Sequence, residues 1–105
     1  MMADNFVFVA KTSEIPVGQF KVAEVKGKRF LVCHTADGFF AIEDTCTHDD
    51  GPLADGFLED NAIECPRHGA RFDVTTGKVL CFPAPTSITS FPVKVEGEEI
   101  KVSIG

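Results

Sequence analysis

The sequence predicts an all-β fold, a small antiparallel sandwich or barrel. Apolar residues recur in short runs that alternate with polar residues, which is the period of a half-buried strand. Turn signals rich in Gly, Asp and Pro separate these runs at close spacing, and no segment keeps a helical period over a useful length. The chain has 105 residues and a hydrophobic share of 44%, which suits one small domain with a real core.

The first half of the chain contains four candidate strands. Asp37-Gly38 is a strong hairpin signal, and Lys26-Gly27-Lys28 marks a second turn. The stretch from 10 to 18 contains Pro16 and Gly18 and is expected to be a loop. The expected strands are Phe6–Val9, Gln19–Val25, Arg29–His34 and Phe39–Glu43.

The second half begins with Asp44–Gly56, which is rich in Asp, Gly and Pro and predicts a loop. Pro92 falls inside a strand-like run and therefore predicts an edge or bulged strand. Phe82-Pro83-Ala84-Pro85 cannot pair regularly and predicts a further loop. The expected strands are Phe57-Leu58, Ala62–Cys65, Arg71–Val74, Lys78–Cys81, Ile88–Val95 and Glu99–Ile104.

Two short motifs between these strands carry candidate metal ligands. They are Cys46-Thr47-His48 and Cys65-Pro66-Arg67-His68, and each offers one thiolate and one imidazole. Two of the four Cys and two of the three His fall in these motifs, and such paired clusters of soft ligands are typical of a metal site. The other candidates are assigned structural roles: His34 lies on an expected strand, and Cys33 and Cys81 are expected to be free thiols rather than a bridge.

The spacing of the ligands favours an iron–sulfur cluster over zinc. Zinc fingers usually pair Cys with Cys and His with His, whereas each pair here is mixed. A 2Fe-2S cluster with two Cys on one iron and two His on the other is the Rieske variant. The two motifs resemble the cluster-binding loops of the Rieske family, and residues 49–64 between them have the length that this family uses. A zinc-stapled binding module without a redox role remains an alternative. Colour distinguishes the two kinds of site, because a zinc site is colourless and a Rieske cluster is not.

The resemblance covers nearly the whole chain and implies a Rieske-like architecture. The basal β part is expected at 1–44 and 83–105, where strands from the two ends of the chain pair with each other. The cluster-binding subdomain is expected at 45–82, and the proline-rich run 82–85 resembles the loop that covers the cluster in this family. By the resemblance, one 2Fe-2S cluster is bound by Cys46 and Cys65 on the inner iron and by His48 and His68 on the outer iron. The imidazole edges are the expected exit route for the electron.

Differences between this chain and one branch of the Rieske family reduce the number of functions to be expected. Rieske proteins that oxidise quinols carry a disulfide between the two loops, but the matching residues here are Gly51 and Arg67. They also place a Ser and a Tyr that hydrogen-bond the cluster sulfurs, where this chain has Ala70 and Phe72. Fewer donors stabilise the reduced, more negative cluster less, so a low potential is expected, toward the lower end of the roughly −150 to +300 mV Rieske range.

Two functions fit a low-potential chain of this kind. The first is the ferredoxin component of a multicomponent aromatic-ring-hydroxylating dioxygenase, which carries single electrons from a flavoprotein reductase to a terminal oxygenase. The second is a Rieske-like small subunit of an assimilatory nitrite reductase or a related redox complex. The acidic surface and the short chain favour the carrier. A catalytic role of its own is not expected, because no Ser–His–Asp set, phosphate loop or mononuclear iron site is visible.

The charge distribution bears on partners and location. The net charge of −6 argues against nucleic acid and anionic membranes as partners. Nine of the sixteen acids fall between Arg29 and Arg67, where no Lys or Arg occurs. They predict either a solvated surface or an acidic rim for a basic partner that docks over His48 and His68. No apolar run approaches the ~20 residues of a membrane span and no export signal is visible, so a cytoplasmic location is expected. A monomer is expected because it suits a shuttle.

Overall fold

The computed structural model describes residues 6–44, 53–65, 70–81 and 88–103. These residues contain strands and two short 3₁₀-helices, with no α-helix, so the predicted all-β class is confirmed. Neither of these helices is long enough and apolar enough to cross a membrane. The elements are β1 (Phe6–Lys11), η1 (Thr12–Glu14), β2 (Phe20–Val25), β3 (Lys28–Thr35), β4 (Gly38–Glu43), η2 (Leu53–Asp55), β5 (Phe57–Glu59), β6 (Ala62–Glu64), β7 (Arg71–Asp73), β8 (Val79–Cys81), β9 (Ser90–Phe91), β10 (Val93–Glu96) and β11 (Glu99–Ser103).

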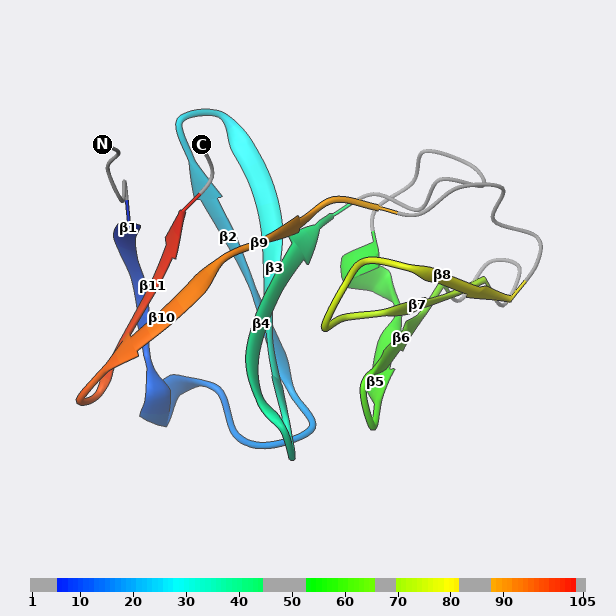
Figure 1. The fold of residues 1–105 in the computed structure, drawn as a ribbon, viewed down its shortest axis with the longest axis horizontal. Coiled ribbons are helices and arrows are strands. Elements are labelled where there is room, and N and C mark those ends of the chain that lie inside the picture. Colours follow the sequence, from blue (N-terminus) through cyan, green and yellow to red (C-terminus); the bar gives the residue numbers. More distant parts are fainter. Residues whose placement is uncertain (1–5, 45–52, 66–69, 82–87, 104–105) are drawn as a thin grey trace.

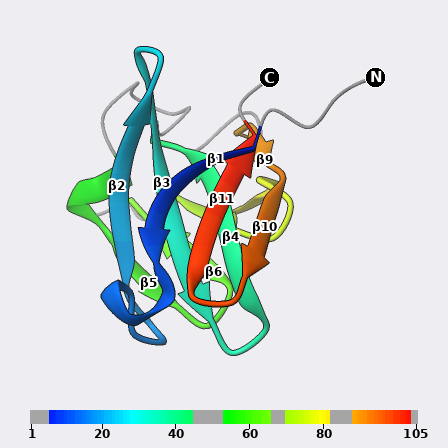
Figure 2. The same cartoon turned by 90° about the vertical axis from the view of Figure 1, so that its left-hand side faces the viewer.

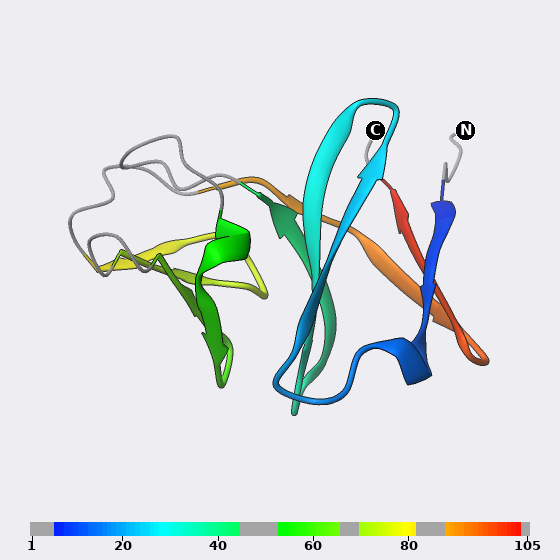
Figure 3. The same ribbon diagram turned by 180° about the vertical axis from the view of Figure 1, so that it is seen from behind.

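The described strands form three antiparallel sheets (Figure 1). The terminal sheet has the order β1-β11-β10, the central sheet β2-β3-β4-β9, and the small sheet β5-β6-β7-β8. The two ends of the chain are joined in the first two sheets, because β1 pairs with β11 and β4 pairs with β9. Figure 2 shows the terminal sheet in front of the central one, and Figure 3 shows η2 with the small sheet on the opposite side. The division into a basal part and an inserted subdomain at the predicted boundaries stays a prediction.

The central strand β3 explains why the sheets stack in this order. Its residues Phe30, Leu31, Val32 and Cys33 are all fully buried. Because neighbouring side chains in a strand point to opposite faces, such a run requires a partner layer on each side. Phe30 and Val32 belong to the core that includes Ile100 and Val102 of the terminal sheet. Leu31 and Cys33 belong to a second core with residues of the small sheet, such as Ile63 and Phe72.

Pro92 divides the strand that the sequence predicts at Ile88–Val95. The residues before it form β9 in the central sheet, and the residues after it form β10 in the terminal sheet. Proline has no N–H to donate to a ladder, so the chain leaves one sheet and enters the other at this residue. The Pro92 carbonyl oxygen still accepts the Ser103 N–H at 3.1 Å. The prediction of one continuous edge or bulged strand was therefore wrong, because two strands in different sheets take its place.

The hairpin between β2 and β3 is tighter than the expected three-residue turn. Val25 pairs with Lys28, which leaves only Lys26 and Gly27 in the connection. Both have positive φ, 53° and 79°, as a type I′ turn requires. The predicted loop at 10–18 contains η1 and the end of β1, and the predicted loop at 44–56 contains η2.

Candidate metal centre

Cys65 lies where the small sheet connects to the second ligand motif. β6 ends at Glu64 and β7 begins at Arg71, and these two residues are paired across the ladder. Inside that pair, the Cys65 N–H donates to the Ala70 carbonyl oxygen at 2.8 Å. This hydrogen bond closes the segment 66–69, which carries His68 in the sequence, at its base. The small sheet therefore fixes the backbone on both sides of this segment.

The surroundings of Cys65 are apolar. Cys65 is fully buried, and Ala70 and Phe72 on the other side of the connection are also fully buried. All three belong to the core that the small sheet shares with Leu31 and Cys33 of β3. Neither Ala70 nor Phe72 carries a side-chain hydrogen-bond donor. A metal ion would offset the charge of a thiolate at this apolar position, so the position is compatible with a metal-bound cysteine.

The first ligand motif falls in the segment 45–52, and described residues on both sides of it are joined by Asp44. The buried Asp44 carboxylate accepts the Ala54 N–H at 2.9 Å through Oδ1. Its Oδ2 accepts the Arg29 Nε–H at 2.6 Å, and the Asp44 N–H donates to the Arg29 carbonyl oxygen at 3.3 Å. Asp44 is thus connected to the chain after the segment and to β3.

A backbone hydrogen bond also joins residues before and after the proline-rich run 82–85, which itself lies outside the described residues. The Ile88 N–H donates to the Gly77 carbonyl oxygen at 2.8 Å. Gly77 has φ +83°, and a Cβ at this position would lie 2.1 Å from the Ile88 carbonyl oxygen. Only glycine combines that backbone conformation with so close an approach.

Of the four predicted ligands, the structure describes Cys65. Cys46, His48 and His68 lie outside the described residues, so the complete ligand set stays a prediction. Among the residues that the structure describes, no group of three or more His, Cys, Asp or Glu side chains is placed to hold a metal ion. The chemistry of the donor set, two thiolates and two imidazoles with one thiolate at a buried position, fits a Rieske cluster.

His34 and Cys33, both on β3, have contacts that indicate structural roles. His34 Nδ1 lies 2.6 Å from the Ile15 carbonyl oxygen, and its ring stacks on Phe39 with 3.9 Å between centroids. Cys33 is a free thiol, and burial raises its pKa to about 12. A thiol with such a pKa stays protonated near neutral pH and is a poor nucleophile. The side chain of Cys81 lies outside the described residues.

The acids between residues 29 and 67 do not form one uniform surface. Asp44 is buried and bonded, so it cannot belong to a solvated rim. Glu59 and Glu64 both approach Arg71, with N···O distances of 3.1 and 3.6 Å. Asp37 accepts a hydrogen bond from Asn61 Nδ2 at 2.6 Å, which joins the β3–β4 turn to the β5–β6 turn. Asp49 and Asp50, the acids nearest to His48 in the sequence, lie outside the described residues.

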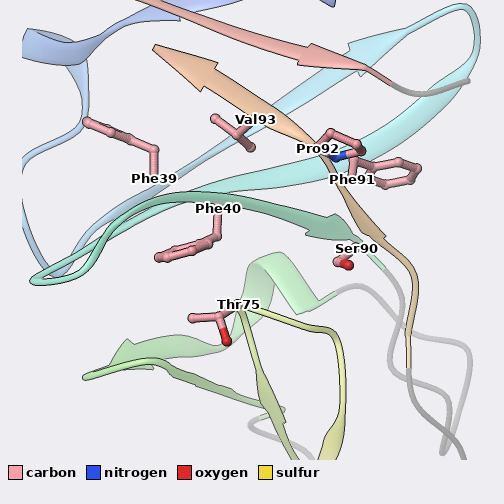
Figure 4. A pocket seen from close by; sticks show the side chains of 7 residues that line it. All are labelled: Phe39, Phe40, Thr75, Ser90, Phe91, Pro92 and Val93. Carbon is pink, nitrogen blue, oxygen red and sulfur yellow. The ribbon is translucent and has the colours of Figure 1, made fainter.

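A shallow groove of about 380 Å³ opens between β4, the β9–β10 strands and the turn after β7 (Figure 4). No sequence motif predicts this groove. Its lining is mostly aromatic and aliphatic, and the polar side chains are two hydroxyls. The residues are Phe39, Phe40, Thr75, Ser90, Phe91, Pro92 and Val93. None of these lining residues is a His, Cys, Asp, Glu, Lys or Arg.

Comparison with known families identifies the chain. The family model of the Rieske [2Fe-2S] domain matches residues 5–92. The chain belongs to this family. The predicted resemblance is therefore confirmed, and with it the cofactor: the chain binds one Rieske-type 2Fe-2S cluster.

Two curated relatives match this Rieske protein over 90% or more of both chains. It is 36% identical over 103 residues to the ferredoxin component of a naphthalene 1,2-dioxygenase system from Pseudomonas aeruginosa, covering 98% of this chain and 99% of the relative. It is 36% identical over 96 residues to the ferredoxin component of biphenyl 2,3-dioxygenase from Rhodococcus jostii (strain RHA1), covering 91% and 90%.

Solved structures of ferredoxins from dioxygenase systems are also similar to this chain. The ferredoxin of carbazole 1,9a-dioxygenase from Nocardioides aromaticivorans IC177 superposes with a TM-score of 0.88 and 32% identity, covering 93% of this chain and 96% of that one. A complex of reduced oxygenase and oxidized ferredoxin in carbazole 1,9a-dioxygenase matches with the same TM-score and identity, covering 96% and 94%. A nitrite reductase small subunit superposes with a TM-score of 0.81 at 14% identity, covering 93% and 97%, and at this identity the likeness shows the fold alone.

Proposed function

We propose that this chain is the ferredoxin component of a multicomponent aromatic-ring-hydroxylating dioxygenase system. It carries single electrons from a flavoprotein reductase to a terminal oxygenase and is not itself the oxygenase. The observation that carries this proposal is the end-to-end identity of 36% to a ferredoxin component of such a system. For the nitrite reductase alternative, the small subunit compared above shares 14% identity with this chain, which shows the fold alone.

The ligands in this proposal are Cys46 and Cys65 on one iron and His48 and His68 on the other. Cys65 supplies a buried thiolate from the closed end of the small sheet. When bound, the cluster takes up and releases one electron at a time. The apolar residues around Cys65 exclude water from the thiolate side of the site. The protein thereby keeps a low-dielectric environment on that side, which influences the potential.

A low reduction potential follows from the residues that flank Cys65. Side-chain donors to cluster sulfur stabilise the reduced state because it carries one more negative charge. Ala70 and Phe72, both fully buried in the core with Cys65, have no such donors. The potential is therefore expected toward the lower end of the Rieske range, which suits delivery of electrons to an oxygenase.

The partners in this proposal dock transiently over His48 and His68. Support for an oxygenase partner comes from the solved complex of a similar ferredoxin with its oxygenase in carbazole 1,9a-dioxygenase. A small acidic protein with a net charge of −6 suits a polar, short-lived interface. The proposal includes a monomer in the cytoplasm, since a shuttle must meet two different partners in turn.

The experiment that tests the cluster is electron paramagnetic resonance of the dithionite-reduced, anaerobically purified protein, together with film voltammetry. The expected result is a rhombic spectrum with low average g and a low potential that does not change with pH near neutrality. His68→Cys is expected to lose this signature through loss or conversion of the cluster. A His68→Cys protein with the same rhombic spectrum would exclude His68 as a ligand, and a colourless protein that contains zinc would overturn the function.

The carrier role is tested by electron delivery to a ring-hydroxylating oxygenase with a flavoprotein reductase as the source. Replacing Asp49 and Asp50 by Asn is expected to slow delivery at low salt, because steering charges raise association rates. The matched control is Glu24→Gln, which removes an exposed carboxylate from β2 in the central sheet. Equal rates for the double variant and the control at low salt would argue against an acidic docking rim.

A further inference from the structure

Three charged side chains of the small sheet lie close together. Arg71 on β7 approaches a carboxylate on each of two other strands: its Nη2 lies 3.1 Å from Glu59 Oε1 on β5, and its Nε lies 3.6 Å from Glu64 Oε1 on β6. These strands are neighbours in the order β5-β6-β7 (Figure 3). Arg71, Glu59 and Glu64 form the Arg71 network, in which one cation faces two carboxylates.

The Arg71 network lies directly beside Cys65. Glu64 and Arg71 are paired in the ladder, and on the next rung the Cys65 N–H donates to the Ala70 carbonyl oxygen at 2.8 Å. Consecutive Cα atoms are about 3.8 Å apart, so the network is one rung from a proposed ligand. Side chains of a strand alternate between faces, and Phe72 belongs to the core with Cys65, so the Arg71 side chain lies on the opposite face of the small sheet.

The contacts of Arg71 are those of a charge rather than of a strong structural bond. Its Nε atom is buried and has no hydrogen-bond partner among the described residues. The 3.6 Å between Nε and Glu64 is too long for a hydrogen bond. The side chain of Glu59 is 64% exposed, so water screens its attraction to Arg71 strongly. The field of the Arg71 network is screened least toward the buried core, where Cys65 lies.

A fixed charge near a redox centre changes the reduction potential of that centre. The reduced cluster carries one more negative charge, so a nearby cation favours it and nearby carboxylates oppose it. Ala70 and Phe72, in the core with Cys65, have no side-chain donor that could favour the reduced state. A positive charge one rung away therefore has a larger share in setting the potential.

We propose that Arg71 raises the reduction potential of the Rieske cluster by offsetting the charges of Glu59 and Glu64 beside Cys65. The cluster takes up one electron and releases it again, and no bond at Arg71 forms or breaks. Arg71 acts through its charge and is not a ligand. The inference rests on Cys65 as a ligand in the proposed function, and it assigns a role to a residue outside the ligand set.

The test is film voltammetry of the holoprotein with substitutions in the Arg71 network. Arg71→Gln removes the cation, and Glu64→Gln removes one carboxylate. The double variant removes both charges, so the net charge of the network stays as in the wild type. Arg71→Lys keeps the positive charge and loses the planar fork of the guanidinium group. Far-ultraviolet circular dichroism establishes that each variant is folded.

The matched control is Lys101→Gln. Lys101 on β11 also contacts two carboxylates, with Nζ 2.7 Å from Glu96 and 3.8 Å from Glu99. The side chains of Lys101 and Arg71 are similarly exposed, at 28% and 35%. Lys101 lies in the terminal sheet, and the core of that sheet does not include Cys65. Lys101→Gln therefore changes the net charge of the protein by the same amount as Arg71→Gln, but away from Cys65.

Arg71→Gln is expected to lower the potential and Glu64→Gln to raise it. Each shift corresponds to about a threefold change in the one-electron reduction equilibrium, which is about 30 mV. The double variant, Arg71→Lys and Lys101→Gln are expected to stay near the wild-type potential. In 1 M salt the Debye length is about 3 Å, so the shifts are expected to shrink. If Arg71→Gln fails to fold, the comparison of Glu64→Gln with Glu96→Gln, the matching carboxylate beside Lys101, decides.

Shifts of opposite sign that cancel in the double variant, with no shift in Lys101→Gln, support the proposal. If Arg71→Gln and Glu64→Gln shift the potential in the same direction, these residues act only through the structure of the sheet, and the proposal is overturned. It is also overturned if Arg71→Gln has the same potential as Lys101→Gln. A wild-type protein without the rhombic signal overturns the ligand set instead, and this proposal with it, so the two failures are distinguishable.

Discussion

The two cores of this protein are built in different ways. The core between the terminal and central sheets is formed by residues of longer strands, such as Phe30 on the eight-residue β3 and Val102 on β11. The small sheet has strands of three residues each, and its core is completed by Leu31, Cys33 and Ile42 from the central sheet. Strands this short bury little surface of their own, so the small sheet depends on the central sheet for stability. Under the proposed ligand set, the bound cluster is expected to add to it.

The largest expected effect compares one phenylalanine from each core. Phe30 and Phe72 are both fully buried, and truncation of either to Ala is expected to cost about 3–5 kcal/mol of unfolding free energy. Only Phe72 shares a core with Cys65. Phe72→Ala is therefore expected to lose the cluster well before the backbone unfolds, whereas Phe30→Ala loses both together. The measurement is a thermal scan that records cluster absorbance and far-ultraviolet circular dichroism on the same sample.

Coincident transitions in Phe72→Ala would contradict this difference, since they would mean that the small sheet and the rest of the chain unfold as one unit. A cluster lost early in Phe30→Ala would contradict it in the opposite sense. The wild-type protein, scanned under the same conditions, sets the order of the two transitions.

A second comparison uses glycines of positive φ in the two regions. Gly27 in the β2–β3 turn has open space around its missing Cβ, so Gly27→Ala meets only the backbone preference, about 1–2 kcal/mol. Gly77 has similar φ, but a Cβ there would lie 2.1 Å from the Ile88 carbonyl oxygen. Gly77→Ala is therefore expected to cost clearly more unfolding free energy than Gly27→Ala, because backbone must move. Denaturant unfolding of both variants measures the difference, and equal midpoints at equal slope would show that the close approach relaxes without cost.

The sequence was sufficient for features that local pattern controls. The uninterrupted run at Phe30–Cys33 indicated a buried strand, and Asp37-Gly38 marked a hairpin that the structure contains, with Thr35 paired to Gly38. The mixed Cys and His motifs indicated the family, because ligand type and spacing are fixed by the cluster and not by distant contacts.

Features that depend on distant contacts could not be predicted in the same way. Pro92 was recognised as a break, but the sequence does not say that the two halves join different sheets, since this depends on the partners β4 and β11. Asp44 was one of nine acids in a run without Lys or Arg, and composition made it a surface residue. Its burial depends on Arg29, fifteen positions earlier, and no periodic pattern connects the two.

The smallest expected effect concerns the potential and compares one buried alanine from each core. Ala70 and Ala41 are both buried, but only Ala70 belongs to the core of Cys65, at the position where quinol-oxidising members of the family carry a serine. A serine hydroxyl at 70 is expected to donate to the cluster and to stabilise the reduced state. A bond that is about 1 kcal/mol stronger in that state raises a one-electron potential by about 40 mV. Film voltammetry measures the shift directly.

Ala41→Ser is the control, because it places the same hydroxyl in the core on the opposite face of the central sheet. Its potential is expected to stay as in the wild type, although its stability falls because a hydroxyl is buried there. A rise in Ala70→Ser alone would show that the absence of a donor at this site keeps the potential low. No rise would mean that the hydroxyl does not reach the cluster, and the low potential would then have to come from the apolar surroundings that the small sheet shares with β3.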